Sequence, residues 1–303
     1  LVDTTDPEEK RAIIGDIFLK ITAKVIDRLG LDPETTFIAQ GTLRPDLIES
    51  GNPDISGFAH KIKTHHNDVK AVRDARAKGL IIETNSDWHK DEVRKVARML
   101  GLEEEIAERQ PFPGPGLAIR LLCHDKSQEA EIQEEDNEKL KNILEQENQQ
   151  GFILPLKSVG VQGDARSYRN LCLMAGDETD LNWKMVTSKA KQITDTISSI
   201  NRVGYILNTQ NITEPIKCWD MKICDECVDL LRELDYIVTT NLEKSKANQT
   251  FAVLIPVGIN KKYSVAIRTF VTNDFMTGRP AEIGTEASKE MIDKIVKEIT
   301  EQF

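Results

Sequence analysis

Residues 110–116 read Gln-Pro-Phe-Pro-Gly-Pro-Gly, and this segment constrains the fold more than any other part of the chain. Proline removes a backbone donor and fixes φ, and glycine favours turns, so neither a helix nor a strand continues through three prolines and two glycines in seven residues. The chain has 303 residues, and cores above about 250 residues usually split into domains. We therefore predict a domain boundary at this segment.

A helix is predicted near the start of the chain. Asp6 can cap it, Pro7 suits its first position, Glu9 fits a capping box, and Gly30 ends it. Apolar residues recur between them at helical spacing, at Ile13, Ile14, Ile17, Phe18, Ile21 and Val25.

Short apolar segments and helices then alternate up to the boundary. Residues 36–40 and 80–83 read as strands, and a helix capped by Asp87 is expected over residues 88–100. This alternation is typical of a parallel α/β sheet. The region is unusual for a doubly wound domain in starting on a helix with no strand before it.

The pattern after the boundary predicts two ferredoxin-like α+β units. The first has the order β-α-β-β-α-β, with strands at 117–123, 151–161, 167–174 and 202–207 and helices at 129–147 and 183–199. Residues 152–156, 168–174 and 180–185 resemble residues 252–257, 263–269 and 274–276, and a helix near 287–299 completes the second copy. A duplication is favoured over a chance likeness of two β-β-α stretches.

These patterns divide the chain into residues 1–116, 117–207 and 208–303. The second copy lacks its last strand and the first region lacks its first, so we expect the chain to be incomplete at both ends. The strand-rich residues from about 117 onward are expected to form a homodimer contact, because they offer sheet surface.

Composition excludes several classes of protein. The net charge of −10 argues against a general nucleic-acid binder, which needs a basic surface. No apolar run reaches the roughly 18 residues of a membrane span and no signal peptide is present, so a cytoplasmic location is expected. Five cysteines are too few and odd in number for a disulfide framework.

Residues 41–50 follow a predicted strand, and ligands of open α/β sheets bind at strand ends. Arg44 can hold a phosphate through two parallel hydrogen bonds, and Asp46 and Glu49 can bind magnesium or ribose hydroxyls. Lys90 lies where a helix start can meet an anion, although an ordinary charged first turn is favoured on pattern alone.

Lys61, Lys63, His65, His66 and Asn67 form a second polar cluster suited to a polyphosphate. A solvated turn is the plainer interpretation of its His-His pair. No metal site is predicted, because regularly spaced third and fourth ligands are absent.

Two further observations on the sequence give little indication of function. Cys224 and Cys227 flank two acidic residues in a predicted helix over residues 221–234, and without a second pair they favour core or surface cysteines over a redox or zinc site. Walker, dinucleotide-binding and hydrolase-elbow motifs are absent from the sequence.

Four segments, in this order, resemble the GMP synthetase family over nearly the whole chain. They are Ile38-Ala-Gln-Gly-Thr-Leu-Arg-Pro-Asp-Leu-Ile-Glu-Ser50, Ile62-Lys-Thr-His-His-Asn67, His89-Lys-Asp-Glu-Val-Arg94 and Pro111-Phe-Pro-Gly-Pro-Gly-Leu117. Val159-Gly-Val-Gln-Gly-Asp164 and Asp274-Phe-Met276 resemble motifs of its dimerisation domain.

The resemblance implies an ATP pyrophosphatase that adenylates xanthosine monophosphate (XMP), using ATP and Mg²⁺. Ammonia released from glutamine by an amidotransferase domain then displaces AMP to give GMP. The substrate site it implies consists of Arg44, Pro113, Gly114, Pro115, Gly116 and Gln249. The ATP and magnesium side has Asp46, Glu49, Thr64 and Asn67, and the catalytic residues are Lys63, His65, His66, Lys90 and Asp91.

Several motifs of the family are absent from this sequence, and their absence affects the expected activity. The Ser-Gly-Gly-Val-Asp-Ser pyrophosphate loop, the amidotransferase triad and the closing Lys-Pro-Pro segment do not occur in this sequence. As written, the chain is not expected to make GMP by itself. The alternative is a catalytically inert dimerisation and XMP-binding fragment; a different pyrophosphatase, such as an NAD synthetase or argininosuccinate synthetase, fits the Pro-Gly segment less well.

Overall fold

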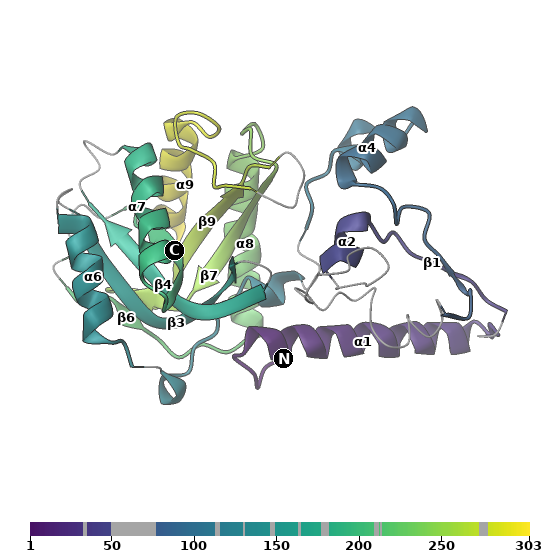
Figure 1. Cartoon of the computed structure of the whole chain (residues 1–303), viewed down its shortest axis with the longest axis horizontal. Helices are drawn as coiled ribbons and strands as arrows, with labels where there is room; N and C mark the ends of the chain where they lie inside the picture. The colour runs from purple at the N-terminus through teal and green to yellow at the C-terminus, as the bar shows by residue number, and fades with distance from the viewer. Residues whose placement is uncertain are drawn as a thin grey trace.

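The computed structural model describes residues 1–32, 35–49, 77–112, 116–129, 131–145, 149–162, 165–176, 182–208, 212, 214–272 and 278–303. We call residues 1–112 the amino-terminal region and residues 116–303 the carboxy-terminal region. Figure 1 shows the carboxy-terminal region on the left and the amino-terminal region on the right, with α1 running along the bottom of the amino-terminal region from its border with the carboxy-terminal region.

The predicted first helix is present as α1 (Pro7–Arg28), and its cap is the predicted one. The Asp6 carboxylate accepts from the backbone N–H groups of Glu8 (2.9 Å) and Glu9 (2.8 Å). Gly30 follows the helix with φ of +63°, a conformation that glycine adopts without strain. The carboxylate of Glu9 accepts from the Thr4 hydroxyl.

The first turns of α1 pack on the carboxy-terminal region. Lys10 is 1% exposed, and its Nζ donates to the Leu121 carbonyl oxygen (3.2 Å) and contacts Cys123 Sγ (2.9 Å). Farther along the helix, Ile17, Phe18, Ile21 and Val25 are exposed. The apolar spacing predicted the helix correctly, but these four side chains are not among the buried core residues of the described part of the chain.

The amino-terminal region contains the expected parallel pairing, in very short strands. β1 (Ile38–Ala39) pairs with β2 (Ile81–Ile82) in parallel, and the helices of the region are α2 (Arg44–Glu49), α4 (Lys90–Met99) and α5 (Glu104–Ala107). The predicted cap Asp87 is wrong: His89 is the residue before α4, and its backbone N–H donates to Glu92 Oε2 (2.8 Å).

The first half of the carboxy-terminal region is a three-stranded sheet with two helices. Its elements are α6 (Glu134–Leu144), β3 (Gln150–Gln162), β4 (Ala165–Ala175), α7 (Trp183–Thr196) and β5 (Ile200–Tyr205). β3 and β4 are antiparallel, and β4 and β5 are parallel. The register of β3 shifts between Leu154 and Lys157, where Pro155 cannot donate to the ladder.

The predicted strand at residues 117–123 does not belong to that sheet. Residues Gly116–Ile119 form a 3₁₀ turn, η2, and the chain then pairs with the other half of the region. Leu122 N–H donates to the Leu254 carbonyl (3.0 Å), and Leu254 N–H donates to the Arg120 carbonyl (2.9 Å). The backbone partners of this segment thus lie more than 130 residues away in sequence, which its local pattern does not reveal.

The second half repeats the order helix, antiparallel strands, helix. It contains β6 (Lys217–Cys218), α8 (Asp225–Asn241), β7 (Gln249–Ile255), β8 (Val257–Gly258), β9 (Ser264–Phe270) and α9 (Lys289–Gln302). β7 pairs with β9, and β6 with β8. A second 3₁₀ turn, η3 (Lys126–Gln128), lies between η2 and α6 in the sequence.

Alternate residues of the strands face different cores. On β4, Cys172 and Met174 pack with α6 and α7, whereas Leu171 and Leu173 pack against the second half. On β7, Leu254 packs with α8 and α9, whereas Ile255 faces the first half. The order of packing is helix, sheet, sheet, helix, so each sheet is covered on both faces within one chain.

Candidate functional site

The carboxyl ends of β1 and β2 bring two loops together. Gln40 N–H donates to the Ile82 carbonyl (2.9 Å), and Arg44 N–H donates to the Trp88 carbonyl (3.1 Å). Between them, the Thr42 hydroxyl donates to Glu83 Oε1 (2.6 Å), and Thr42 is 1% exposed. Residues 41–44 thus follow the carboxyl end of β1, and open α/β sheets commonly bind ligands at this edge.

Two of the predicted residues lie on α2, directly after β1. Arg44 is the first residue of the helix and is exposed. Asp46 Oδ2 accepts from the Leu43 backbone N–H (2.9 Å), so this carboxylate also stabilises the helix start. Glu49 is the last residue of α2, and its side chain lies outside the described part of the chain.

Lys90, the first residue of α4, lies in a cluster of charges. Burial lowers its pKa below the usual value of 10.5; Arg94 and Arg109 lower it further, while Asp46 opposes the shift. The structure thus places Lys90 near Asp46, on the side where two arginines add positive charge. Such a cluster suits an anion with several charges, such as a polyphosphate.

Asp91 has a different setting from its neighbour. Its carboxylate is 3.9 Å from Lys95 Nζ, one turn along α4, and the side chain is 47% exposed. A pair at this spacing is an ordinary surface pair. The structure shows no contact that distinguishes Asp91 as a catalytic group among the described residues.

Gln249 lies against the boundary segment. Its Nε2 donates to the Pro111 carbonyl oxygen. Gln110 reinforces the contact: its Nε2 donates to the Thr250 carbonyl (3.1 Å), and its Oε1 accepts from the Thr250 N–H (2.9 Å). Gly116, with φ of +67°, ends the segment. The structure therefore places Gln249 against Pro111, at the amino-terminal end of the predicted Pro-Gly loop.

Arg120 is an important residue of this boundary that the sequence interpretation missed. It is 2% exposed, and its Nη1 lies 2.6 Å from Asp235 Oδ1 on α8. Its guanidinium stacks 4.7 Å from the centre of the Phe112 ring and 5.5 Å from that of Phe251. Asp235 also accepts from the Ala252 N–H (2.8 Å). A lone arginine inside the apolar run at residues 117–123 was the available signal.

Several predicted residues lie outside the described residues: Lys63, Thr64, His65, His66, Asn67, Pro113, Gly114 and Pro115. Within the described ranges, no three His, Cys, Asp or Glu side chains gather as a metal site would require. The helices that the structure describes include none with the length and apolar character to cross a membrane.

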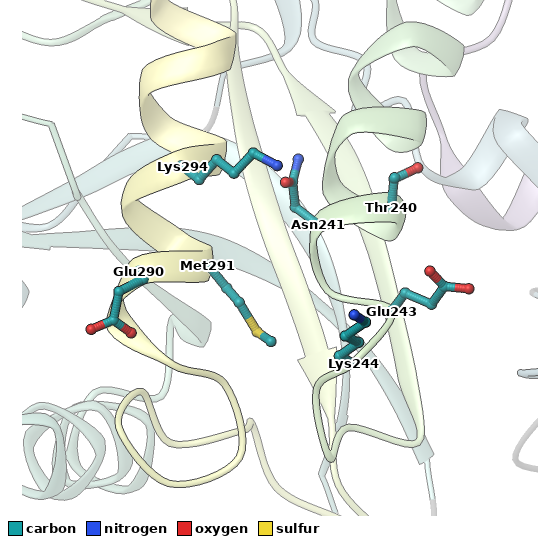
Figure 2. Close-up of a pocket in the computed structure, with 7 residues that line it drawn as sticks. All are labelled: Thr240, Asn241, Glu243, Lys244, Glu290, Met291 and Lys294. Atoms are coloured by element: carbon teal, nitrogen blue, oxygen red, sulfur yellow. The ribbon is translucent and has the colours of Figure 1, made fainter.

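A separate pocket of about 340 Å³ lies between the end of α8 and the start of α9 (Figure 2). It is lined by Thr240, Asn241, Glu243, Lys244, Glu290, Met291 and Lys294. Lys294 and Asn241 point toward each other across it, and the Asn241 amide donates to Glu298 Oε2 (3.0 Å). The pocket contains none of the predicted site residues.

Comparison with curated proteins gives a consistent result. The chain is 37% identical over 99% of its length to GMP synthase [glutamine-hydrolyzing] of Dictyostelium discoideum and 33% identical over 99% to the probable GMP synthase of Caenorhabditis elegans. It is 37% identical over 91% of its length to a probable GMP synthase of Leptospira interrogans. The chain covers 48%, 49% and 46% of these relatives, and so spans about half of their length.

No family model matches the chain. The similarity to named proteins nevertheless extends from one end of the chain to the other, and it includes both the loops at β1 and β2 and the boundary segment that Gln249 contacts. The chain is a homologue of the GMP synthases.

Proposed function

We propose that the protein containing this chain makes GMP from XMP, ATP and ammonia, through an adenyl-XMP intermediate. The observation that carries the proposal is the similarity of 99% of the chain to GMP synthases. The geometry supports it, because the predicted nucleotide-binding residues that are described lie at a strand-end edge and at the boundary between the two regions.

The ATP side of the site is assigned to the edge formed by β1 and β2. Lys90 would attract the triphosphate, and the cluster of Lys63, Thr64, His65, His66 and Asn67 would complete this side. Mg²⁺ is usually held by one or two carboxylates together with substrate phosphates, and Asp46 and Glu49 would supply them. When bound, the ion would neutralise charge on the phosphates.

The XMP side is assigned to Arg44, Gln249 and the Pro113–Gly116 loop. Arg44 is exposed and can hold a phosphate through two hydrogen bonds. Gln249 already donates to the Pro111 carbonyl, so it can position the loop as well as touch the base. The described residues do not join Arg44 to Gln249 by a hydrogen bond or ion pair, and a bound nucleotide would bridge them.

The reaction asks mainly for orientation and charge neutralisation. The xanthine oxygen attacks the α-phosphate, pyrophosphate leaves, and ammonia displaces AMP. Positively charged groups such as Lys90 would stabilise the charge that develops on the phosphates. Holding the two nucleotides in line supplies much of the remaining acceleration.

Ammonia would come from an amidotransferase domain outside this sequence, and we place the reaction in the cytoplasm. We also propose a homodimer, formed by the residues from about 117 onward. Both sheet faces are covered within one chain, so a dimer contact would use helices, loops or strand edges of these residues. Light scattering on the 303-residue chain tests it: a dimer has twice the 34.2 kDa of one chain.

Calorimetry on the protein that contains this chain tests the proposed site. Arg44→Ala is expected to weaken XMP binding by about 1.5–3 kcal/mol, or one to two decades in dissociation constant, while ATP binding changes far less. Arg28→Ala, an exposed arginine at the end of α1, is the control. Equal losses for both nucleotides would refute the role of Arg44.

A second measurement separates the enzyme from the alternative of an inert dimerisation and XMP-binding fragment. An enzyme exchanges labelled pyrophosphate into ATP when XMP is present, because adenylation is reversible. A binding fragment holds XMP and shows no such exchange.

A further inference from the structure

We propose that Cys224 and Cys227 are a thiol pair that closes reversibly into a disulfide when a disulfide oxidant is present. The two Sγ atoms lie 3.0 Å apart. A disulfide bond is about 2.05 Å long, so the sulfurs need approach by only about 1 Å from their observed separation. The sequence pattern favoured ordinary core or surface cysteines, and this distance is the observation that changes the interpretation.

The pair is positioned by the start of α8. Cys224 is the residue immediately before the helix, and Cys227 lies in its first turn. The Val228 N–H donates to the Cys224 carbonyl (3.1 Å), which closes that turn over both residues. Residues three apart lie on the same side of a helix, so the two thiols face each other without any change of fold.

The two cysteines differ in access, as a reactive pair requires. Cys224 is half-buried and can meet an oxidant of the size of glutathione disulfide. Cys227 is 3% exposed, packs in the same core as Leu231 and Leu234, and lies 3.7 Å from the Tyr263 hydroxyl. Cys227 therefore cannot react first with an external disulfide, but it is within reach of Cys224.

The chemistry balances with glutathione disulfide as the oxidant. Cys224 loses its proton, and its sulfur attacks the disulfide; one glutathione leaves and a mixed disulfide remains on Cys224. Cys227 then loses its proton and attacks the Cys224 sulfur, so the second glutathione leaves. In sum, two protein thiols lose two protons and two electrons, and one glutathione disulfide is reduced to two glutathione molecules.

The surroundings favour a slow pair over a fast catalytic thiol. The hydrogen bond to Cys227 raises the pKa of the Cys224 thiol to about 11, so the thiolate is scarce at neutral pH. Burial raises the pKa of Cys172 to about 12 and that of Cys218 to about 11, and neither thiol is exposed. A zinc site is not supported, because no third ligand joins the pair among the described residues.

Thiol labelling tests the pair on the 303-residue chain. The protein is equilibrated in glutathione buffers from fully reduced to fully oxidised, then unfolded and alkylated, and the peptides are weighed. We expect five alkylated cysteines in the reduced buffer and two fewer in the oxidised buffer, with both missing labels at Cys224 and Cys227. The rate of disulfide formation should rise about tenfold per pH unit between pH 7 and 9, because the fraction of Cys224 present as thiolate rises by the same factor.

Two variants sharpen the result. Cys224→Ser changes a half-buried side chain, and all four remaining cysteines should be alkylated in every buffer. Asp225→Asn alters the adjacent charge, keeps both thiols and should behave like the original chain. The proposal is overturned if both thiols remain alkylated in the oxidised buffer, or if Cys224 stops at a stable glutathione adduct. No nucleotide enters the experiment, so its outcome is independent of the proposed function.

Discussion

The two regions differ sharply in how they cover their apolar side chains. Among the described residues, the buried apolar side chains of the amino-terminal region are Leu47 and Ala107, while Ile17, Phe18 and Ile21 of α1 are 44–56% exposed. The carboxy-terminal region has three clusters of buried side chains, and its strands are used on both faces. The difference in burial arises because the two halves of the carboxy-terminal region cover each other's sheets.

The comparison bears on where a site can be placed. Gln249 belongs to the well-packed region, whereas Arg44 and Lys90 lie on short elements of the other region. Segments with few buried apolar contacts open locally at low free-energy cost, and ligand-binding elements are commonly drawn from them. The proposed site would thus combine residues of a well-packed region with residues of elements that have few buried apolar contacts.

The largest effect is expected at the buried ion pair of the carboxy-terminal region. Asp235→Asn leaves the buried Arg120 without its carboxylate, and breaking a buried pair typically costs about 3–5 kcal/mol. Asp229→Asn is the matched control, because Asp229 pairs with Arg232 at 2.7 Å on the surface of the same helix, and such pairs contribute about 0–1 kcal/mol. Urea unfolding measures both. Equal losses would show that the Arg120–Asp235 pair stabilises the fold no more than a surface pair does.

A pair of isoleucines compares the regions directly. Ile193 on α7 is 0% exposed, and Ile193→Ala should lower the free energy of unfolding by about 2–5 kcal/mol. Ile21 on α1 is 56% exposed, and Ile21→Ala should cost about 0.5 kcal/mol or less. The comparison breaks if the two variants lose similar stability in urea, because α1 would then have a core that the described residues do not show.

Lys90 gives a smaller effect that depends on pH. Burial lowers its pKa, so it loses its proton at a lower pH than an ordinary lysine, and its attraction for an anion fades as pH rises through that lowered value. When Lys90 loses its proton, the affinity of the protein that contains this chain for pyrophosphate should fall about tenfold. This corresponds to the loss of roughly 1.4 kcal/mol from one charged contact. The Lys90→Arg variant keeps its charge, so its affinity for pyrophosphate should depend less on pH than that of the original protein. If the variant and the original protein show the same pH dependence, Lys90 does not belong to the site.

Local chemistry explains which parts of the fold were predictable. The cap of α1 was predicted correctly because Asp6 and the helix start are neighbours in sequence. The short strands β1 and β2 were found because each is an apolar run between polar residues. The segment at 117–123 was misassigned because its backbone partner is Leu254, and a distant partner leaves no trace in local periodicity.

The residues of the candidate site likewise fall into those that local sequence predicted and those that it did not. Arg44 and Lys90 could be nominated from their places after a strand and at a helix start. Gln249 came only from the resemblance, because nothing in its own neighbourhood points to Pro111, 138 residues away. Arg120 was missed since it stands in an apolar run, and its partner Asp235 is 115 residues distant.

The smallest predicted effect compares two helix caps. Asp6 caps α1 by accepting from Glu8 and Glu9, and Asn182 caps α7 by accepting from Lys184 (3.1 Å) and Met185 (3.3 Å). Replacing either by alanine should cost about 1 kcal/mol. The consequences should differ, because α7 is held by Val186 and Ile193 in the core, while the later turns of α1 depend more on the cooperativity of the helix itself. Hydrogen exchange measures this difference. Asp6→Ala should speed amide exchange about fivefold along residues 17–28, because 1.4 kcal/mol corresponds to a tenfold change and the lost cap costs about 1 kcal/mol.

Asn182→Ala should speed amide exchange only in the first turn of α7. If exchange changes only in the first turn of α1 as well, the later turns are held by contacts as strong as those of the carboxy-terminal region, and the contrast between the regions does not extend to α1.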